Sequence, residues 1–305
     1  TGVPVLGVMP YLALDLEDED GVVLQPGSQK YRQQGDRELD VAVIQVPHIS
    51  NFTDFNALAA QPDVGLRYVS QPAQLGTPDL LILPGSKNTL GDLQWLHDSG
   101  LAVAIMQAHG QQVPIIGVCG GFQMLGNQLI DGVESGIDRM PGLGLLDCET
   151  VFARQKVTTR VLAQVQADAN GLFADCAMAA LEGYEIHMGE TSRGPAARPF
   201  TLITCRNQLG AEVEDGAINA EGRVAGTYIH GLFDSADFTR SLLNRLRQRK
   251  GLAPLADTAF DYRQYKSNQF DQLAAAFREH VDMAAIYRIL QYKQAQHPLD
   301  LEPQV

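Results

Sequence analysis

The sequence predicts an α/β fold in which a mostly parallel sheet carries helices on both faces, with a β-rich second half and a C-terminal helical tail. Short apolar runs alternate with helical patterns from residue 40 to residue 129, and this alternation favours right-handed crossovers and a parallel sheet. Strand-like runs joined by Gly, Asn and Asp turns follow between residues 145 and 230. Helical periodicity returns from residue 235. With 305 residues, the chain is long enough to bury a sizeable core.

The first forty residues are expected to hold little regular structure. VPVLGVMPYL (3–12) is typical of a strand and a loop, and the acidic run DLEDED (15–20) follows it. Residues 26–38 are polar and contain several Gly and Gln residues. This composition predicts a linker.

Buried parallel strands are expected as short apolar runs. Four such runs are DVAVIQVP (40–47), VGLRYVS (64–70), DLLILP (79–84) and VPIIGV (113–118). Helices are expected at NFTDFNALAA (51–60), SKNTLGDLQWLHDSG (86–100), LAVAIMQAHG (101–110) and GFQMLGNQL (121–129). Because ligands bind beyond the carboxyl ends of parallel strands, the residues after the third and fourth runs are candidate site segments.

The second half predicts strands first and helices afterwards. Strands are expected at TTRVLAQVQAD (158–168), LEGYEIHMGET (181–191), FTLITCRNQ (200–208) and RVAGTYIHGLF (223–233). A helix capped by Ser235 is expected to run to residue 251. Residues 270–291 predict one long amphipathic helix.

Composition argues against several classes of function. The net charge of −13 disfavours nucleic-acid binding, which needs a basic surface. No run approaches the ~20 apolar residues of a membrane span, and the first residues lack the features of a secretory signal. We therefore expect no membrane association and a cytoplasmic location. The cysteines at 119, 148, 176 and 205 form no CxxC pair, so neither a metal site nor a disulfide framework is expected.

A nucleophile motif lies where the fourth apolar run gives way to a helix. Gly117-x-Cys119-x-Gly121 has the spacing of an elbow in which a strained turn presents a side chain and flanking glycines allow close backbone packing. The free N–H groups of the following helix favour a thiolate and can bind an oxyanion. We predict that Cys119 is a nucleophile. The alternative is a buried cysteine beside a glycine-rich turn.

A thiol nucleophile usually needs a base, and two of the seven histidines are candidates. His230 in VAGTYIHGLFD ends a strand-like run and precedes a glycine, and His187 in YEIHMGE is similarly placed. The pattern alone leaves both candidates open, together with a structural role for either. The other histidines are expected to be structural or exposed: His48, His97, His109, His280 and His297.

The segment LPGSKNT (83–89) follows a buried strand and opens a helix. Its backbone N–H groups at Gly85 or Ser86 are candidates for one donor of an oxyanion hole, with the N–H of Gly120 as the other. A plain turn with a helix cap explains the same pattern equally well. No GxxxxGK[ST] phosphate loop is present in the sequence.

Four motifs together resemble a known family: LPGSKNT, GVCGGFQMLG, GYEIHMGET and GTYIHGLFD. They are similar to those of class I (triad-type) glutamine amidotransferases, in the branch found in cobyric acid synthase and cobyrinic acid a,c-diamide synthase. The resemblance implies a flavodoxin-like amidotransferase domain at 39–250 and a C-terminal helical tail at 251–305. It also implies that residues 1–25 are the remnant of an ATP-dependent synthetase domain, so that the chain would be the C-terminal part of such an enzyme.

The resemblance implies a role for each matching position. Cys119 would attack the side-chain amide of glutamine, with His230 as its base. Gln123 matches a glutamine-binding position. Tyr184 and His187 match a motif of this branch and are expected near the active face, either touching substrate or purely structural. Ammonia would pass to a corrinoid acid, adenosylcobyrinic acid a,c-diamide, activated by ATP and Mg in the synthetase domain; this chain itself is expected to hold no cofactor.

One position departs from the superfamily. Its commonest form has His-x-Glu, in which the glutamate orients the base, whereas Leu232 stands two residues after His230 here. The branch likewise lacks this glutamate, which predicts a weakly oriented imidazole. Asp234 or Glu190 are candidates to replace it. Two other functions remain open: a glutaminase subunit that serves a lipid-linked peptidoglycan precursor, and a non-catalytic corrinoid-binding module.

Overall fold

The computed structural model describes residues 2–16, 37–133, 136–166, 170–256 and 260–296. The chain divides into two compact units, one made of residues 1–17 with 263–305 and the other of residues 18–262. Most of the predicted linker at 26–38 lies outside the described residues. The predicted domain boundaries therefore stay predictions.

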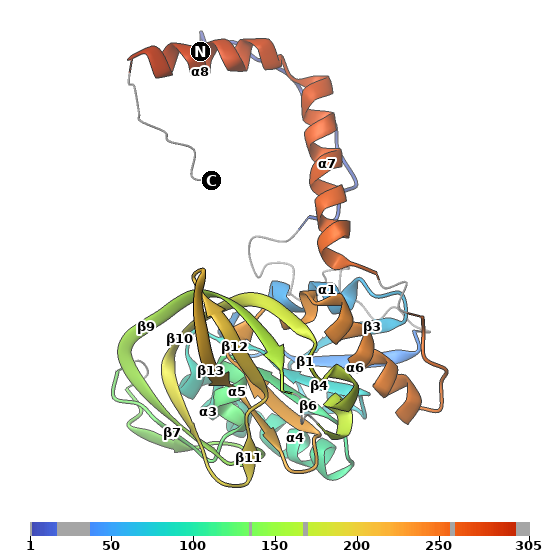
Figure 1. Ribbon diagram of the computed structural model, residues 1–305, viewed down its shortest axis with the longest axis vertical. Helices are drawn as coiled ribbons and strands as arrows, with labels where there is room; N and C mark the ends of the chain where they lie inside the picture. Colours follow the sequence, from blue (N-terminus) through green and yellow to red (C-terminus); the bar gives the residue numbers. More distant parts are fainter. Residues whose placement is uncertain (1, 17–36, 134–135, 167–169, 257–259, 297–305) are drawn as a thin grey trace. The chain divides into compact units, whose positions relative to one another are not determined.

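The larger unit contains a seven-stranded sheet (Figure 1) with the order β11-β14-β15-β6-β4-β1-β3. The strands that run parallel to one another are β1 (Leu39–Ile44), β3 (Val64–Val69), β4 (Leu80–Leu83), β6 (Ile115–Val118) and β15 (Val224–Thr227). An antiparallel edge is added by β14 (Ala217–Asn219) and β11 (Ala197–Arg198). The predicted mostly parallel sheet is confirmed.

Helices cover both faces of this sheet. Every residue of β4 and β6 is buried, as expected of strands with helices on each side. One face carries α3 (Thr89–Asp98), α4 (Leu101–Gly110) and α5 (Gly120–Leu125), beside the short α2 (Pro72–Leu75). The other face carries α1 (Asn56–Ala59) and α6 (Ala236–Arg249). Ser235 caps α6 by accepting a hydrogen bond from the backbone N–H of Phe238, as predicted.

A second sheet supplies the β-rich half that the sequence predicts. Its main path runs β13-β12-β9-β10-β16, with β7 and β8 beside β9. The strands are β7 (Gln128–Ile130), β8 (Arg139–Pro141), β9 (Cys148–Val165), β10 (Ala180–Arg193), β12 (Thr201–Arg206), β13 (Leu209–Asp215) and β16 (Ile229–His230). A separate two-stranded ladder joins β2 (Ile49–Ser50) to β5 (Gly85–Ser86). The described residues of this unit also contain the 3-10 turns η2 (Phe52–Phe55), η3 (Gly171–Cys176) and η4 (Leu232–Asp234).

Two predicted helices differ from those observed. The helix expected over 121–129 ends at Leu125, because Gly126 adopts extended backbone angles and residues 128–130 pair as β7. The single helix expected over 270–291 is two helices, α7 (Tyr262–His280) and α8 (Met283–Gln296). Asp282 separates them by capping α8: its side-chain oxygen accepts a hydrogen bond from Ala285 N at 2.9 Å.

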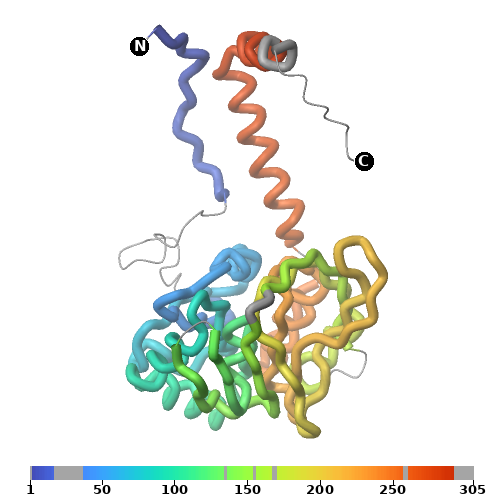
Figure 2. Tube along the Cα trace, turned by 90° about the vertical axis from the view of Figure 1, so that its left-hand side faces the viewer, coloured from blue at the N-terminus to red at the C-terminus, as the bar shows by residue number. Residues whose placement is uncertain are grey.

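The smaller unit pairs the N-terminal stretch with the C-terminal helices. Residues 2–16 run beside α7 (Figure 2), Gly7 forms a bridge to Val281, and Asp15 accepts a hydrogen bond from Tyr265 at 3.0 Å. None of the residues whose side chains are described in this unit, 2–16 and 263–291, is buried. The unit therefore has no hydrophobic core of its own among these residues.

The helices of the described part of the chain are too short or too polar to cross a membrane. The cytoplasmic location stays a prediction.

Candidate active site

Cys119 lies at the tip of a strained turn between β6 and α5. Its backbone angles are φ 52° and ψ −109°, which L residues rarely adopt. The backbone N–H of Cys119 donates to Thr227 O at 2.8 Å, which ties the turn to β15. A Cβ added to Gly121 would lie 2.0 Å from Leu83 O, and one added to Gly117 would lie 2.7 Å from Gly121 O. The two glycines therefore allow the close packing that the elbow needs, as the motif predicts.

The candidate oxyanion donors lie on two adjacent segments. A Cβ added to Gly120 would lie 2.9 Å from Ser86 N, so the backbones of the elbow helix and β5 are in close contact. The hydroxyl of Ser86 donates to Asp92 at 2.6 Å and accepts from Asn88 N at 2.9 Å. Since the hydroxyl is occupied in this way, Ser86 can offer the site its backbone N–H rather than its side chain. Gly85, one residue earlier, lies next to His230, since its added Cβ would be 3.5 Å from the imidazole Cε1.

His230 ends β16 and is completely buried. Its Nδ1 lies 2.6 Å from a carboxylate oxygen of Asp54, and its Nε2 has no hydrogen-bond partner among the described residues. Burial disfavours the charged ring, but the Asp54 carboxylate and the Cys119 sulfur outweigh it and raise the pKa of His230 to about 10. The Cys119 thiol itself donates to Ile186 O at 3.5 Å, so the sulfur and the imidazole Nε2 are not hydrogen-bonded to each other in this structure. Apo enzymes often hold such pairs loosely until substrate binds.

Tyr184 supports the imidazole from β10. The rings of Tyr184 and His230 stack with centroids 4.9 Å apart and an angle of 17°. Asn51 donates a hydrogen bond to the Tyr184 hydroxyl at 2.6 Å, and burial raises the pKa of Tyr184 to about 12. The phenol therefore stays protonated at neutral pH and contacts the base rather than lining the pocket.

Gln123 is held rigidly at the first turn of the elbow helix. Its side-chain oxygen accepts from Thr89 at 3.2 Å, and its amide nitrogen donates to the Tyr228 hydroxyl at 3.0 Å. Tyr228 continues the chain of hydrogen bonds to Thr191 at 2.6 Å. Because both ends of the amide are engaged, Gln123 presents one fixed orientation to the pocket.

His187 lies on the pocket wall. Its ring stacks on Tyr228 with centroids 3.8 Å apart, and its Nδ1 lies 2.8 Å from Gly189 O. Its Nε2 is 3.7 Å from the buried carboxylate of Glu185. Burial raises the pKa of Glu185, but the nearby His187 and the hydrogen bonds from Thr159 and Arg206 outweigh this effect and lower it. Of the two candidate bases, His230 is the one with a carboxylate at hydrogen-bond distance.

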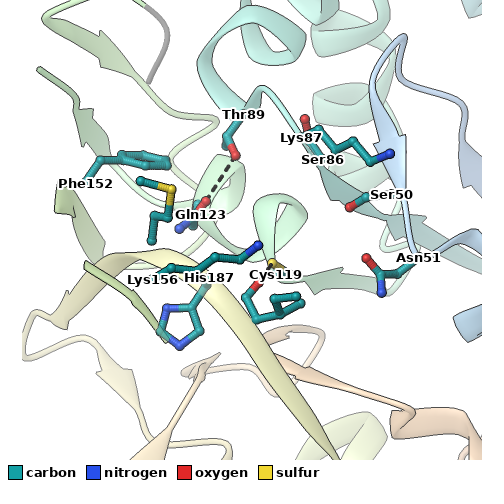
Figure 3. Close-up of a pocket in the computed structure, with 12 residues that line it drawn as sticks. Ser50, Asn51, Ser86, Lys87, Thr89, Cys119, Gln123, Phe152, Lys156 and His187 are labelled. Atoms are coloured by element: carbon teal, nitrogen blue, oxygen red, sulfur yellow. Dashed lines mark hydrogen bonds between the residues drawn. The ribbon is translucent and has the colours of Figure 1, made fainter. Parts of the chain in front are cut away.

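A pocket of about 270 Å³ opens above Cys119. Figure 3 shows the end of the Lys156 side chain beside Cys119, whereas Lys87 extends away from Cys119 on the side of Ser50. The other lining residues are Ser50, Asn51, Ser86, Thr89, Gln123, Phe152, Ile186, His187 and Met188. The set includes two lysines and no Asp or Glu, although the chain carries a net charge of −13. Sites for drug-sized ligands begin near ~300 Å³, so this pocket suits one small molecule that carries a carboxylate, such as an amino acid.

The other thiols are placed differently from Cys119. Burial raises the pKa of both Cys148 and Cys176 to about 12, so these two remain protonated thiols at neutral pH. Cys205 is half-buried on β12. The cysteine that lines the pocket is Cys119. Among the described residues, no group of three or more His, Cys, Asp or Glu side chains is arranged to hold a metal ion.

Most residues predicted from the motifs converge on one place: Cys119, Gly120, Gly85, Ser86, Gln123, Tyr184, His187 and His230. Sequence reasoning missed Asp54, Thr89, Tyr228 and the two pocket lysines. Tyr228 lies within the quoted GTYIHGLFD motif, and Lys87 and Thr89 lie within LPGSKNT, so the motifs themselves could have indicated these three. Asp54 lies 176 residues before His230, and no local pattern marks it.

The predicted replacements for the missing glutamate were wrong. His230 bonds neither Asp234 nor Glu190; the carboxylate at its Nδ1 is that of Asp54. Glu190 is exposed on β10. The imidazole is firmly held rather than weakly oriented, because η2 brings Asp54 against β16.

Comparison with known proteins agrees with this geometry. Residues 40–238 match the model of the CobB/CobQ-like glutamine amidotransferase domain. The chain belongs to this family. It is 59% identical over 294 residues to a cobyric acid synthase of Yersinia enterocolitica, and 60% identical over 290 residues to one of Photorhabdus laumondii. These alignments cover 96% and 95% of this chain but 57% and 56% of the relatives, so the chain spans little more than half their length.

The fold is similar to that of a solved structure. The structure of PurLQS from Thermotoga maritima aligns with a TM-score of 0.50 at 19% identity and covers 68% of this chain and 99% of that one. The family match confirms the predicted fold class and the assignment of this CobB/CobQ-like domain as a glutamine amidotransferase.

Proposed function

We propose that this chain hydrolyses glutamine through a thioester on Cys119 and supplies the ammonia for amidation of a corrinoid. The observation that carries the proposal is an elbow cysteine that lines a pocket sized for an amino acid. Its turn packs against the segment of Gly85 and Ser86, and this segment lies next to a carboxylate-bound histidine. This is the arrangement that acyl transfer by a nucleophile and base requires.

In the first half of the reaction, the Cys119 sulfur attacks the amide carbon of glutamine after His230 takes the thiol proton. The negative charge that develops on the amide oxygen is stabilised by the N–H of Gly120 and that of Ser86 or Gly85. The high pKa of His230 lets the ring keep the proton until the amide nitrogen accepts it. Ammonia then leaves, and the γ-glutamyl group stays on the sulfur.

In the second half, water replaces ammonia in the same place. His230 removes a proton from the water, the hydroxide attacks the thioester, and the proton returns to the departing sulfur. The sum of the two halves is glutamine plus water to glutamate plus ammonia. No cofactor or metal enters this scheme.

The pocket charges favour a ligand with a carboxylate. Lys87 follows β5 and Lys156 lies on β9, so the two-stranded ladder and the second sheet each contribute one ammonium group. With no acid among the lining residues, the α-carboxylate of glutamine finds opposite charge there while Gln123 offers amide groups. We propose that the two lysines and Gln123 bind glutamine by its polar ends.

Substitution of Cys119 tests the hydrolysis. Ammonia release from glutamine by Cys119→Ala is expected to fall to background, because loss of the nucleophile in a comparable enzyme costs on the order of 10⁶ in kcat. Cys205→Ala is the matched control, since this half-buried thiol lies outside the pocket. Equal ammonia release by wild type and Cys119→Ala would remove Cys119 from the mechanism.

We further propose a corrinoid acid as the acceptor, because the relatives that the chain resembles are called cobyric acid synthases. In this proposal an ATP-dependent synthetase region with Mg activates a side-chain carboxylate of adenosylcobyrinic acid a,c-diamide, and ammonia from the glutaminase forms the amide. The polypeptide joined to such a region is tested with glutamine carrying ¹⁵N in its side-chain amide, ATP, Mg and the corrinoid acid. A labelled corrinoid amide is expected by mass spectrometry. Glutamine hydrolysis without corrinoid labelling would leave the glutaminase intact and point to another acceptor.

A further inference from the structure

We infer that Asp54 positions and charges His230, and so takes the part that the glutamate of His-x-Glu plays in other amidotransferases. The inference deepens the proposed function, because it concerns the base of the same reaction. It assigns this part to a residue in the 3-10 turn η2, far from the His230 motif in the sequence.

Both oxygens of the Asp54 carboxylate form hydrogen bonds with the segment His230-Gly231. One oxygen lies 2.6 Å from Nδ1 of His230, and the other accepts from the backbone N–H of Gly231 at 3.2 Å. The first contact selects the tautomer that leaves Nε2 free for the sulfur. The second fixes the backbone next to the histidine. Together, the two hydrogen bonds fix the carboxylate relative to both the ring and the backbone.

The surroundings make this contact strong and directional. Asp54 is 6% exposed and His230 is fully buried, so water does not compete for the hydrogen bond. The Tyr184 ring stacks on the imidazole, and its hydroxyl is bonded by Asn51, which precedes η2. The same short stretch of chain therefore bonds the ring on its edge and braces the aromatic residue on its face.

The groups that face the imidazole leave Asp54 as its carboxylate partner. They are Asp54 from η2, Cys119 from the elbow and Tyr184 from β10. Burial keeps Tyr184 neutral. Among the described residues, no second carboxylate accepts a hydrogen bond from the ring.

The segment that carries Asp54 also reaches the other half of the site. Ser50 lies in β2, which pairs with β5, and the register places Ser50 opposite Gly85. Ser50 and Asn51 both line the pocket. Asp54 therefore follows closely after β2, the strand that pairs with β5 and its candidate oxyanion donors. The same stretch of chain contacts both the base and the strand that carries these donors.

Asp54→Asn is the sharpest test, because it keeps the shape and removes the charge. We expect kcat for ammonia release to fall by as much as ~10⁴ with KM little changed, since the amide stabilises the wrong tautomer. Asp234→Asn and Glu190→Gln are the matched controls, and both are expected to retain wild-type kcat. Circular dichroism and thermal unfolding check that each variant is folded.

Two further readouts separate positioning from a merely structural role. The pKa of His230, followed by NMR of the imidazole in the substrate-free protein, is about 10 in the wild type by the structure and is expected to fall in Asp54→Asn. In His230→Asn, adding Asp54→Asn is expected to cause no further loss of kcat, because the two residues act as a unit. Asp54→Ala repeats both measurements if the asparagine variant unfolds.

The outcomes distinguish this inference from the proposed function. A wild-type protein that releases no ammonia from glutamine would overturn the glutaminase proposal, while the NMR titration would still test Asp54. A folded Asp54→Asn variant with unchanged kcat and an unchanged His230 pKa would overturn the role of Asp54 and leave the glutaminase standing. A kcat loss in Asp234→Asn or Glu190→Gln as large as in Asp54→Asn would equally contradict it.

Discussion

The sulfur and the imidazole of the site are held in two different ways. Cys119 is fixed by backbone: a strained turn, two glycines and a hydrogen bond to β15 set its position. His230 is fixed by side chains that come from η2 and β10. The difference teaches that the nucleophile is encoded in a few consecutive residues, whereas the base depends on contacts between distant parts of the chain.

The largest effect is expected at the backbone that fixes Cys119, where the packing is closest. Gly121→Ala places a Cβ 2.0 Å from Leu83 O, and neither backbone segment can move without opening the sheet. We expect a loss of about 3 kcal/mol or more in the free energy of unfolding, seen as a fall in Tm of roughly 6–12 °C.

Gly132→Ala is the matched control for this glycine. It is exposed, and its added Cβ meets no atom within 4 Å, so its Tm should be close to that of the wild type. Equal Tm values for the two variants would mean that the elbow is not constrained by backbone packing.

An intermediate effect is expected at Gln123, which contacts residues near both Cys119 and His230. Gln123 on α5 connects Thr89 of the first sheet's helix layer to Tyr228 next to β16. Gln123→Leu takes one hydrogen-bond partner from each hydroxyl, which costs about 1–3 kcal/mol, and is expected to raise KM for glutamine. Thermal unfolding and ammonia-release kinetics measure the two effects. Gln107→Leu, on the exposed side of α4, should change neither, and a wild-type KM in Gln123→Leu would contradict the glutamine-binding role.

The smallest effect is expected at Tyr184, whose ring stacks on the face of the His230 imidazole. Tyr184→Phe keeps the stacked ring and loses the hydrogen bond from Asn51, which costs about 0.5–1.5 kcal/mol. Because Asp54 still orients His230, kcat should stay within a few-fold of wild type. Asn51→Ala removes the same hydrogen bond from the other end and should match it in unfolding experiments. A kcat loss in Tyr184→Phe as large as in Asp54→Asn would show that stacking geometry and the hydroxyl, not the carboxylate, control the base.

Local pattern was enough to predict one half of the site and most of the fold. The apolar runs of β4 and β6 and the glycines around Cys119 act through neighbouring residues, so their spacing carries the information. The same holds for the Ser235 cap of α6. The long helix expected over 270–291 failed because its apolar period continues through Asp282, whose capping role depends on its own side chain.

The other half of the site depended on contacts that no spacing records. Asp54 contacts His230 only because the fold brings η2 next to the end of β16. Lys156 lines the pocket because β9 runs beside it. Leu232 correctly indicates that the usual glutamate is absent, yet the sequence gives no sign of where a substitute lies. Fold topology, which only the structure supplies, decides this.

The smaller unit exposes apolar side chains and has no buried residue among those whose side chains are described. Apolar side chains stand out from it at Val3, Val5, Tyr11, Phe270 and Tyr287, each more than half exposed. Isolated amphipathic helices gain most of their stability from the face they bury, and clustered apolar side chains in water promote self-association. In purified form, these residues are therefore where we expect aggregation and protease cleavage to begin, and a detergent or a fusion that shields them is the practical remedy.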